Sequence, residues 1–226
     1  MKDTRECKIV YRLPYRAYGQ DNIGGEGHYC RYRRCVYPNN WRNVILKLSL
    51  LTLALCAAPV FAANPLADFY DGELKGVEKD VTSLAGAMPA NKYDFAPTSG
   101  AFTGVRTFAQ QAKHVATVMY LVSAAALNQK PPVDVGSGEN GPDSVRTKEQ
   151  VVEYLKGAFA FAHKSIATIT PQNQLENVKS PFGGTMPRVL TASMPTSHSF
   201  DHYGQMVVYA RMNGVVPPAS LPAPPK

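Results

Sequence analysis

Four stretches of the chain space their apolar residues alternately three and four positions apart, and no stretch shows the two-residue alternation of a strand. They cover about residues 65–88, 104–128 and 147–170, and a last stretch ends at about 213. A helix with one apolar stripe has to bury it against other helices. The pattern therefore predicts an all-α four-helix bundle, with long irregular loops between helices two and three and between helices three and four.

Recognisable start and stop signals flank these segments. Asn64 before Pro65 is typical of a cap followed by proline at the first helical position. Thr147 with a glutamine three residues later forms a capping box at the third helix. Gly214 and the two prolines that soon follow it end the last helix. The start of that helix stays open: Pro195 either begins it or bends a helix that started near Arg188.

Positive charge is concentrated at the front of the chain. Residues 1–62 hold ten Lys and Arg against four Asp and Glu, whereas residues 63–226 hold fourteen against thirteen. A nearly neutral body gives no support to nucleic-acid binding. We therefore divide the chain into a front segment, 1–62, and a bundle domain, 63–226.

The front segment contains the pattern of a secretory signal peptide. Arg42 and Lys47 precede an apolar run at 48–62 that closes with small residues, which predicts cleavage after Ala62. The run is shorter than the ~20 residues that a membrane-spanning helix needs. We therefore expect an exported, periplasmic or secreted bacterial protein without a stable membrane span after processing. A signal peptide rarely follows a prefix as long as residues 1–41. We therefore favour the interpretation that translation starts later in the chain or that these residues are removed.

All four cysteines lie before the predicted cleavage point, at positions 7, 30, 35 and 56. The segment Gly27–Cys35 offers two of them with one histidine, a weak zinc signal because no second half follows. A mature chain would then contain no disulfide, thiolate nucleophile or sulfur ligand. Any metal would have to be held by histidine, carboxylate and water.

Two histidines stand four residues apart in the last helix, at His198 and His202. Side chains at that spacing lie on one helix face, so both rings can point at one spot. Met206 and Tyr209 continue the same stripe, which predicts that the pair faces the interior. Burying two imidazoles without a common partner is costly, so the pair favours a metal site.

Four motifs, taken together with their order along the chain, resemble the DinB-like family of four-helix bundles over most of residues 65–220. The carrying segments are 88–97, 106–116, 198–205 and 209–218. The resemblance implies a divalent metal bound by one histidine of the second helix and a His-x-x-x-His pair of the fourth. The matching positions are His114, His198 and His202. The chain departs from the family at Pro195 and Asp201, where relatives usually have uninterrupted helix and often another histidine.

A three-histidine site leaves positions for water or substrate, which indicates a catalytic rather than a structural site. Such ligands suit Zn or Ni best, with Fe, Mn and Co as alternatives. Asp201 is a candidate for orienting a ring or handling protons, against a solvent-facing alternative. Gln205 and Arg211 are candidates for pocket or subunit-contact residues.

Aromatic residues at helical spacing are usually core, so Tyr120, Tyr203 and Tyr209 are weaker candidates for lining a pocket. His163, at the edge of the third stripe, is expected to be structural or exposed. No phosphate-binding glycine loop or Ser-His-Asp arrangement accompanies them.

These features lead to three hypotheses about function. The first is a metal-dependent enzyme that acts on an unidentified small molecule. Hydrolysis is preferred over the thiol-dependent S-transfer of some relatives, because the cytosolic thiols that S-transfer uses would be scarce after export. The second is a non-catalytic module that binds metal or a ligand. The third is a dimeric interaction bundle, and a homodimer is compatible with all three.

Overall fold

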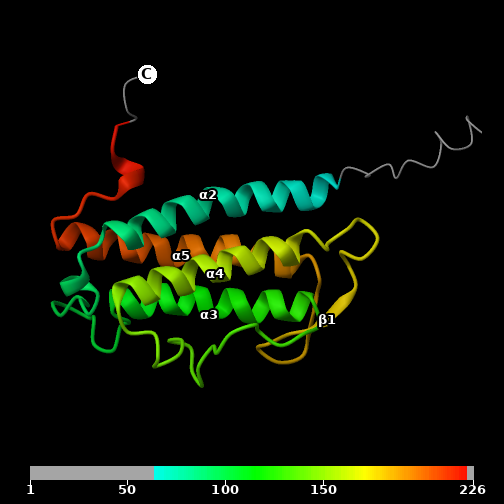
Figure 1. The fold of residues 1–226 in the computed structure, drawn as a ribbon, viewed down its shortest axis with the longest axis horizontal. Coiled ribbons are helices and arrows are strands. Elements are labelled where there is room, and N and C mark those ends of the chain that lie inside the picture. Colours follow the sequence, from blue (N-terminus) through cyan, green and yellow to red (C-terminus); the bar gives the residue numbers. More distant parts are fainter. Residues whose placement is uncertain (1–63, 223–226) are drawn as a thin grey trace, which may run out of the picture. The chain divides into compact units, whose positions relative to one another are not determined.

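The computed structural model describes residues 64–222, and this part of the chain is the predicted four-helix bundle. Its four α-helices are α2 (Pro65–Ala87), α3 (Phe108–Ala126), α4 (Lys148–Ile166) and α5 (Leu190–Met212). Short 3₁₀ turns at Ala90–Lys92 (η1) and Pro218–Ser220 (η2) accompany them. The helices lie side by side along the long axis of the domain (Figure 1).

The direction of the helices explains the long loops. In Figure 1, α2 and α5 run one way, whereas α3 and α4 run the other way. Two consecutive parallel helices require the chain to return along their whole length, so residues 127–147 cross back beneath α3. We call residues 127–147 the crossover loop.

The predicted apolar stripes form the core. Four residues of the α2 stripe, Leu74, Val77, Val81 and Leu84, are fully buried. The centre of the bundle also contains large side chains from the other three helices, including Phe108, Met119, Leu155, Phe159, Ile166 and Met206. Fully burying a side chain of this size contributes ~1.5–3 kcal/mol relative to leaving it exposed. The stripes therefore fix which face of each helix turns inward.

Two of the predicted helix starts are confirmed in detail. The Asn64 side chain accepts the Ala67 amide at 3.3 Å, with Pro65 as the first helical residue. The Thr147 hydroxyl and the Gln150 side chain form the capping box of α4. The second helix, however, begins at Phe108 rather than near 104, because a second capping box at Thr107 sets its start.

Pro195 lies inside α5, which already begins at Leu190. The alternative of a helix that starts near Arg188 is therefore the one adopted, and Pro195 does not open it. A proline in a helix interior lacks the amide that would bond to the carbonyl four residues earlier. At the other end, Gly214 adopts a positive φ of 73°, as expected of a helix-terminating glycine.

The structure adds one short hairpin to the predicted all-α bundle, which no alternation in the sequence indicated. Residues Asn177–Lys179 (β1) and Thr185–Pro187 (β2) pair as a small antiparallel hairpin, with Val178 opposite Met186. Both side chains are buried, and they pack with Val118 and Val122 of α3 in a second, smaller apolar cluster. Three-residue strands are too short to show a reliable alternation in the sequence. The hairpin is fixed by contacts with α3 instead.

The predicted signal peptide, its cleavage point and the boundary at residue 62 lie outside the described residues. Within residues 64–222, none of the helices is long and apolar enough to cross a membrane.

Candidate metal centre

Three histidines from two antiparallel helices converge at one point of the bundle. His114 is in the second turn of α3, and His198 and His202 lie one turn apart on α5. One nitrogen from each ring lies within 4.8 Å of the other two. His114 and His202 are each only 6% exposed, and His198 is half-buried. The predicted i, i+4 pair and the residue indicated by the family resemblance therefore meet.

The spacing of the rings fits a shared ion. Nε2 of His114 and Nε2 of His198 are 3.2 Å apart. The His202 ring centroid lies 4.6 Å from each of the other two. Two imidazole nitrogens bound at ~2.05 Å to one tetrahedral ion would be separated by about 3.3 Å. The observed separation of the two Nε2 atoms is close to that value.

Hydrogen bonds on the outer side of two rings set which nitrogen faces inward. Nδ1 of His114 lies 2.6 Å from the Glu139 carbonyl oxygen, and a carbonyl can only accept, so Nδ1 carries the proton. Nδ1 of His202 lies 2.5 Å from Oε1 of Gln111, whose amide group donates in turn to Oε1 of Gln205 at 2.9 Å. In both rings Nε2 is left with its lone pair free, as metal ligation requires.

The crossover loop supplies the Glu139 carbonyl and is tied down at several points. Arg106, just before α3, donates to the Glu139 carboxylate at 2.7 Å and to the Asn140 side chain at 2.8 Å. The half-buried Lys113 donates to two further loop carbonyls, those of Pro142 and Val145. The loop is therefore anchored on both sides of the His114 ring.

Glycine is required where the crossover loop folds on itself. Gly136 has a φ of 76°, and a Cβ there would lie 2.8 Å from the backbone of Gly141. A side chain at Gly136 would therefore both strain the backbone and push apart the two arms of the loop that carries Glu139.

Burial keeps the three histidines His114, His198 and His202, which we call the triad, unprotonated at neutral pH. It lowers the pKa of His198 to about 4, helped by repulsion from the other two rings. Burial and then repulsion from His114 lower the pKa of His202 to about 4 as well. The pKa of His114 is also lowered by burial, which outweighs the opposite effect of its bond to the Glu139 carbonyl. Neutral imidazoles are the form that binds a metal ion.

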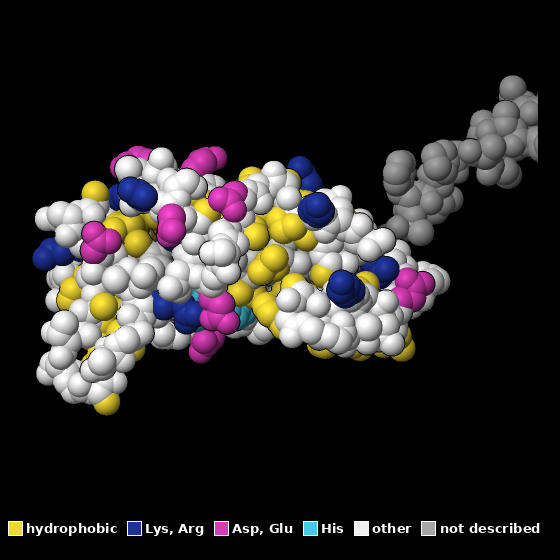
Figure 2. Space-filling view, turned by 90° about the horizontal axis from the view of Figure 1, so that it is seen from below, with side chains coloured by type: hydrophobic (Ala, Val, Ile, Leu, Met, Phe, Trp, Pro, Cys, Tyr) yellow, Lys and Arg dark blue, Asp and Glu magenta, His cyan; other side chains and the backbone are white. Residues whose placement is uncertain are grey.

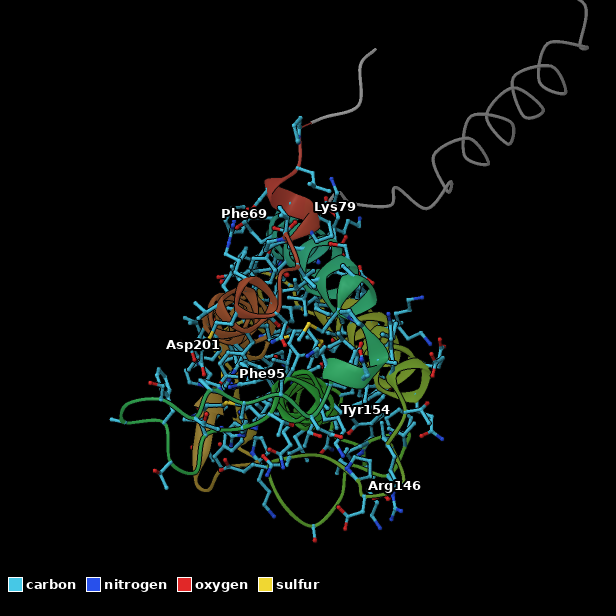
Figure 3. All side chains as sticks on the ribbon, turned by 90° about the vertical axis from the view of Figure 1, so that its left-hand side faces the viewer. Phe69, Lys79, Phe95, Arg146, Tyr154 and Asp201 are labelled. Atoms are coloured by element: carbon cyan, nitrogen blue, oxygen red, sulfur yellow. The ribbon has the colours of Figure 1, made fainter. Side chains whose placement is uncertain are left out.

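Asp201 lies at the edge of the triad and faces solvent. Its side chain is 71% exposed, and its carboxylate comes no closer than 3.9 Å to Nε2 of His202. Figure 3, which looks along the bundle, shows Asp201 on the outer side of α5. At that distance Asp201 makes no hydrogen bond to the ring, so it does not orient the ring directly.

The other candidates are spread over the domain. Tyr120 packs against Tyr154 and Phe161, and Tyr209 packs against Phe95, so both contribute to the core. Tyr203 is a half-buried residue at the edge of that core.

Gln205 reaches the site indirectly, through its bond from Gln111. Arg211 is exposed and donates to Ser220 at 3.0 Å, in the η2 turn and outside the triad. His163 links α4 to α2 through bonds to Asp71 and Glu78, in agreement with its expected structural role.

A cavity of about 570 Å³ adjoins the triad, and His114 and His198 form part of its wall. The rest of the wall comes from α3, the crossover loop, the turn of the hairpin and the first turns of α5. Figure 2 shows hydrophobic side chains gathered beside the visible histidine atoms on this face. A volume of this size is typical of sites for small molecules.

Sequence reasoning missed Gln111, Glu139 and Phe182. Gln111 lies three residues before His114 on the same helix face, a signal that could have identified it. The role of Glu139 depends on its backbone carbonyl, which no residue type reveals. Phe182 reaches the cavity only because the hairpin folds onto α3.

The chain belongs to the DinB superfamily, whose family model matches residues 73–206, more than half of the chain. No curated protein matches it in sequence. Fold, family and the three-histidine arrangement thus agree, and the cluster defines a possible metal site whose metal is not identified.

Similar solved structures include a DinB-like protein from Bacillus cereus ATCC 10987, 14% identical with a TM-score of 0.51, covering 65% of this chain and 94% of that one. A DinB-like protein from Bacillus subtilis is 13% identical, with a TM-score of 0.49 and coverages of 68% and 96%. A mycothiol-dependent maleylpyruvate isomerase is 13% identical, with a TM-score of 0.47 and coverages of 62% and 60%. At 14% identity, the likeness to the Bacillus cereus protein shows a shared fold alone.

Proposed function

We propose that the protein is an exported, metal-dependent enzyme of hydrolase type. The observation that carries the proposal is the convergence of His114, His198 and His202 at the wall of a cavity large enough for a small substrate. Nε2 of each ring would hold a divalent ion, most plausibly Zn or Ni. Three protein ligands leave coordination positions free for water and substrate.

When bound, such an ion polarises a substrate oxygen and lowers the pKa of water toward neutrality. The chain contributes the rest of the chemistry. Gln111 and the Glu139 carbonyl hold two rings in the ligating tautomer. In hydrolysis, the oxygen of water bonds to the substrate's electrophilic atom, the bond to the leaving group breaks, and the leaving group takes a proton. We propose that the exposed carboxylate of Asp201 passes protons between this site and solvent.

Export supports hydrolysis over thiol transfer. Residues 42–62 have the pattern of a cleaved signal peptide, and cleavage after Ala62 would remove every cysteine. The cytosolic thiols used by S-transferases would be scarce outside the cytoplasm. N-terminal sequencing of protein recovered from the periplasm or medium tests this part of the proposal. A first residue at Ala63 supports export, whereas an uncut chain in the cytoplasm contradicts it.

The central experiment combines metal analysis with activity assays. We expect purified protein to contain about one divalent ion per chain and to hydrolyse members of a panel of esters, amides and phosphoesters. His202→Ala should abolish both, whereas His163→Gln, a matched change at a histidine outside the triad, should keep both. Circular dichroism checks that each variant stays folded. Stoichiometric metal without turnover would leave a non-catalytic metal-binding protein, and a folded protein that takes up no metal would overturn the proposal.

A further inference from the structure

The cavity beside the triad has an apolar wall. The non-polar side chains that line it come from α3, the crossover loop, the hairpin turn and α5: Val118, Leu121, Val135, Pro181, Phe182 and Met194. Thr117 and Ser137 add two hydroxyl groups. A wall of this kind binds an apolar group by removing its surface from water, while a few polar groups orient it.

Among the residues that the structure describes, 64–222, no lysine or arginine lines the same wall. Apart from the two histidines, its only titratable side chain is Glu139, and that carboxylate already bonds to Arg106 at 2.7 Å. Away from the triad, a charged group of a substrate would therefore meet no lysine or arginine and would lie close to the Glu139 carboxylate. Burying an anion without a partner is costly, so the cavity disfavours an anionic group at the end of the substrate that lies away from the triad.

The neighbouring cations lie in other hollows. Arg106 lines a smaller pocket of about 300 Å³ together with Gln111 and Gln205. Lys130 and Lys179 line an adjoining hollow of about 480 Å³, which shares Leu121 and Pro181 with the cavity. An anion that reached Arg106 would have to displace the Glu139 carboxylate. The cavity that adjoins His114 and His198 therefore differs from these two hollows, because none of the described residues in its wall is a lysine or an arginine.

Phe182 is placed to contact the far end of a substrate. It lies in the turn between β1 and β2, and it is 58% exposed although it forms part of the cavity wall. The turn is held in place because Val178 and Met186 of the two strands are buried against α3. A ligand that fills the cavity would therefore remove part of this exposed ring from solvent.

We infer that the substrate is an uncharged ester or amide whose acyl group is apolar and about the size of a hexanoyl or phenylacetyl group. The inference rests on the proposed function, because it places the reacting carbonyl at the triad and the acyl chain along Val118, Leu121 and Phe182. Water adds to the acyl carbon, the bond from that carbon to oxygen or nitrogen breaks, and the leaving group takes the proton. Acyl groups with a terminal carboxylate are excluded.

Binding is measured first, by calorimetry on the zinc-loaded full protein, so that the test does not depend on turnover. Phenylacetamide and hexanamide are compared with 4-carboxyphenylacetamide and with the monoamide of adipic acid, which carry a carboxylate at the end far from the amide. We expect each neutral amide to bind at least tenfold more tightly than the anion of similar size. Phe182→Ala should weaken hexanamide binding about fivefold, and Leu175→Ala, an exposed residue outside the cavity, should not change it.

A second variant tests the charge argument directly. Ser137→Lys places a cation in the wall at an exposed loop position, and it should reduce or reverse the preference for hexanamide over the monoamide of adipic acid. Ester hydrolysis is then followed with nitrophenyl esters of increasing acyl length. We expect kcat/KM to rise about fourfold per methylene up to six carbons, because each buried methylene contributes ~0.8 kcal/mol.

The outcomes separate this inference from the proposed function. Selective binding of neutral amides without turnover of any ester or amide would support the binding preference and contradict the hydrolase. Turnover without a preference for apolar neutral substrates would keep the hydrolase and overturn the inference. Tighter binding of the anions, or no binding of any of the four probes, would also overturn it.

Discussion

At His202, one neutral side chain decides which ring nitrogen carries the proton. The Oε1 atom of Gln111 accepts from Nδ1, which leaves Nε2 with its lone pair toward the other two histidines. Gln205 in turn holds the Gln111 amide. His114 reaches the same state through a backbone carbonyl instead of a side chain. Two different acceptors, a side-chain amide oxygen and a backbone carbonyl, thus produce the same ligating tautomer.

Gln111→Leu should therefore weaken metal binding about 10- to 100-fold, because the buried His202 ring loses the acceptor that fixes its orientation. Affinity is measured by competition with a chelator of known strength. Gln205→Ala is the matched control: it removes only the outer bond, so its effect should be several times smaller. Equal affinities for Gln111→Leu and the unaltered protein would contradict the role assigned to Gln111.

The depressed pKa values predict how the metal-free protein responds to acid. The unfolded chain binds protons at histidines near pH 6.5, whereas folded His198 and His202 do so only near 4. Below pH 6.5 the unfolded state therefore binds more protons, and stability falls from there toward pH 4. After allowance for their partial exposure and coupling, we expect a loss of about 2 kcal/mol between pH 7.5 and 5.

Urea unfolding at the two pH values measures this loss. The double variant His198→Gln, His202→Gln should lose clearly less stability over the same range, because it lacks both titrating rings. A loss of the same size in the double variant would show that other groups cause the acid sensitivity.

At the scale of elements, the crossover loop is as much a part of the site as the two helices. Gly136→Ala should lower both unfolding free energy, by about 1–3 kcal/mol, and metal affinity, because the new Cβ would collide with Gly141 at a positive φ. Gly138→Ala, in the same loop, meets nothing within 4 Å and is the control. Both are compared by urea unfolding and chelator competition. Similar behaviour of the two variants would contradict the proposed role of the loop.

The helices could be predicted from sequence because they depend on local signals. Each of these signals involves residues within one or two helical turns of each other. The structure confirms the apolar stripes of α2 and α4 and the caps at Asn64 and Thr147. The i, i+4 pair on α5 also follows from local spacing. His114 required the family resemblance, since nothing in α3 alone marks that histidine as different from a buried structural one.

The missed elements depend on contacts between distant residues. The β1–β2 hairpin is stabilised by burying Val178 and Met186 on α3, and its strands are too short to show a recognisable alternation in the sequence. The Glu139 carbonyl reaches His114 only because the crossover loop is anchored by Arg106 and Lys113. A reading of sequence periodicity carries no information about such contacts.

At the scale of the whole molecule, the bundle brings together the antiparallel helices α3 and α5, and the rings of the triad meet between them. The crossover loop and the hairpin then close the sides of one cavity over that point. The apolar core is built from other residues, so loss of the three histidines should affect binding of an ion more than folding of the core.

The most direct measurement is a crystal structure of the zinc-loaded protein with anomalous scattering recorded at the zinc edge. A shared metal site predicts one anomalous peak, about 2.0–2.1 Å from Nε2 of each of His114, His198 and His202. In a His114→Ala variant that keeps its fold, the peak should be lost or strongly weakened. A peak elsewhere, or contact with only one of the three rings, would contradict a shared metal site.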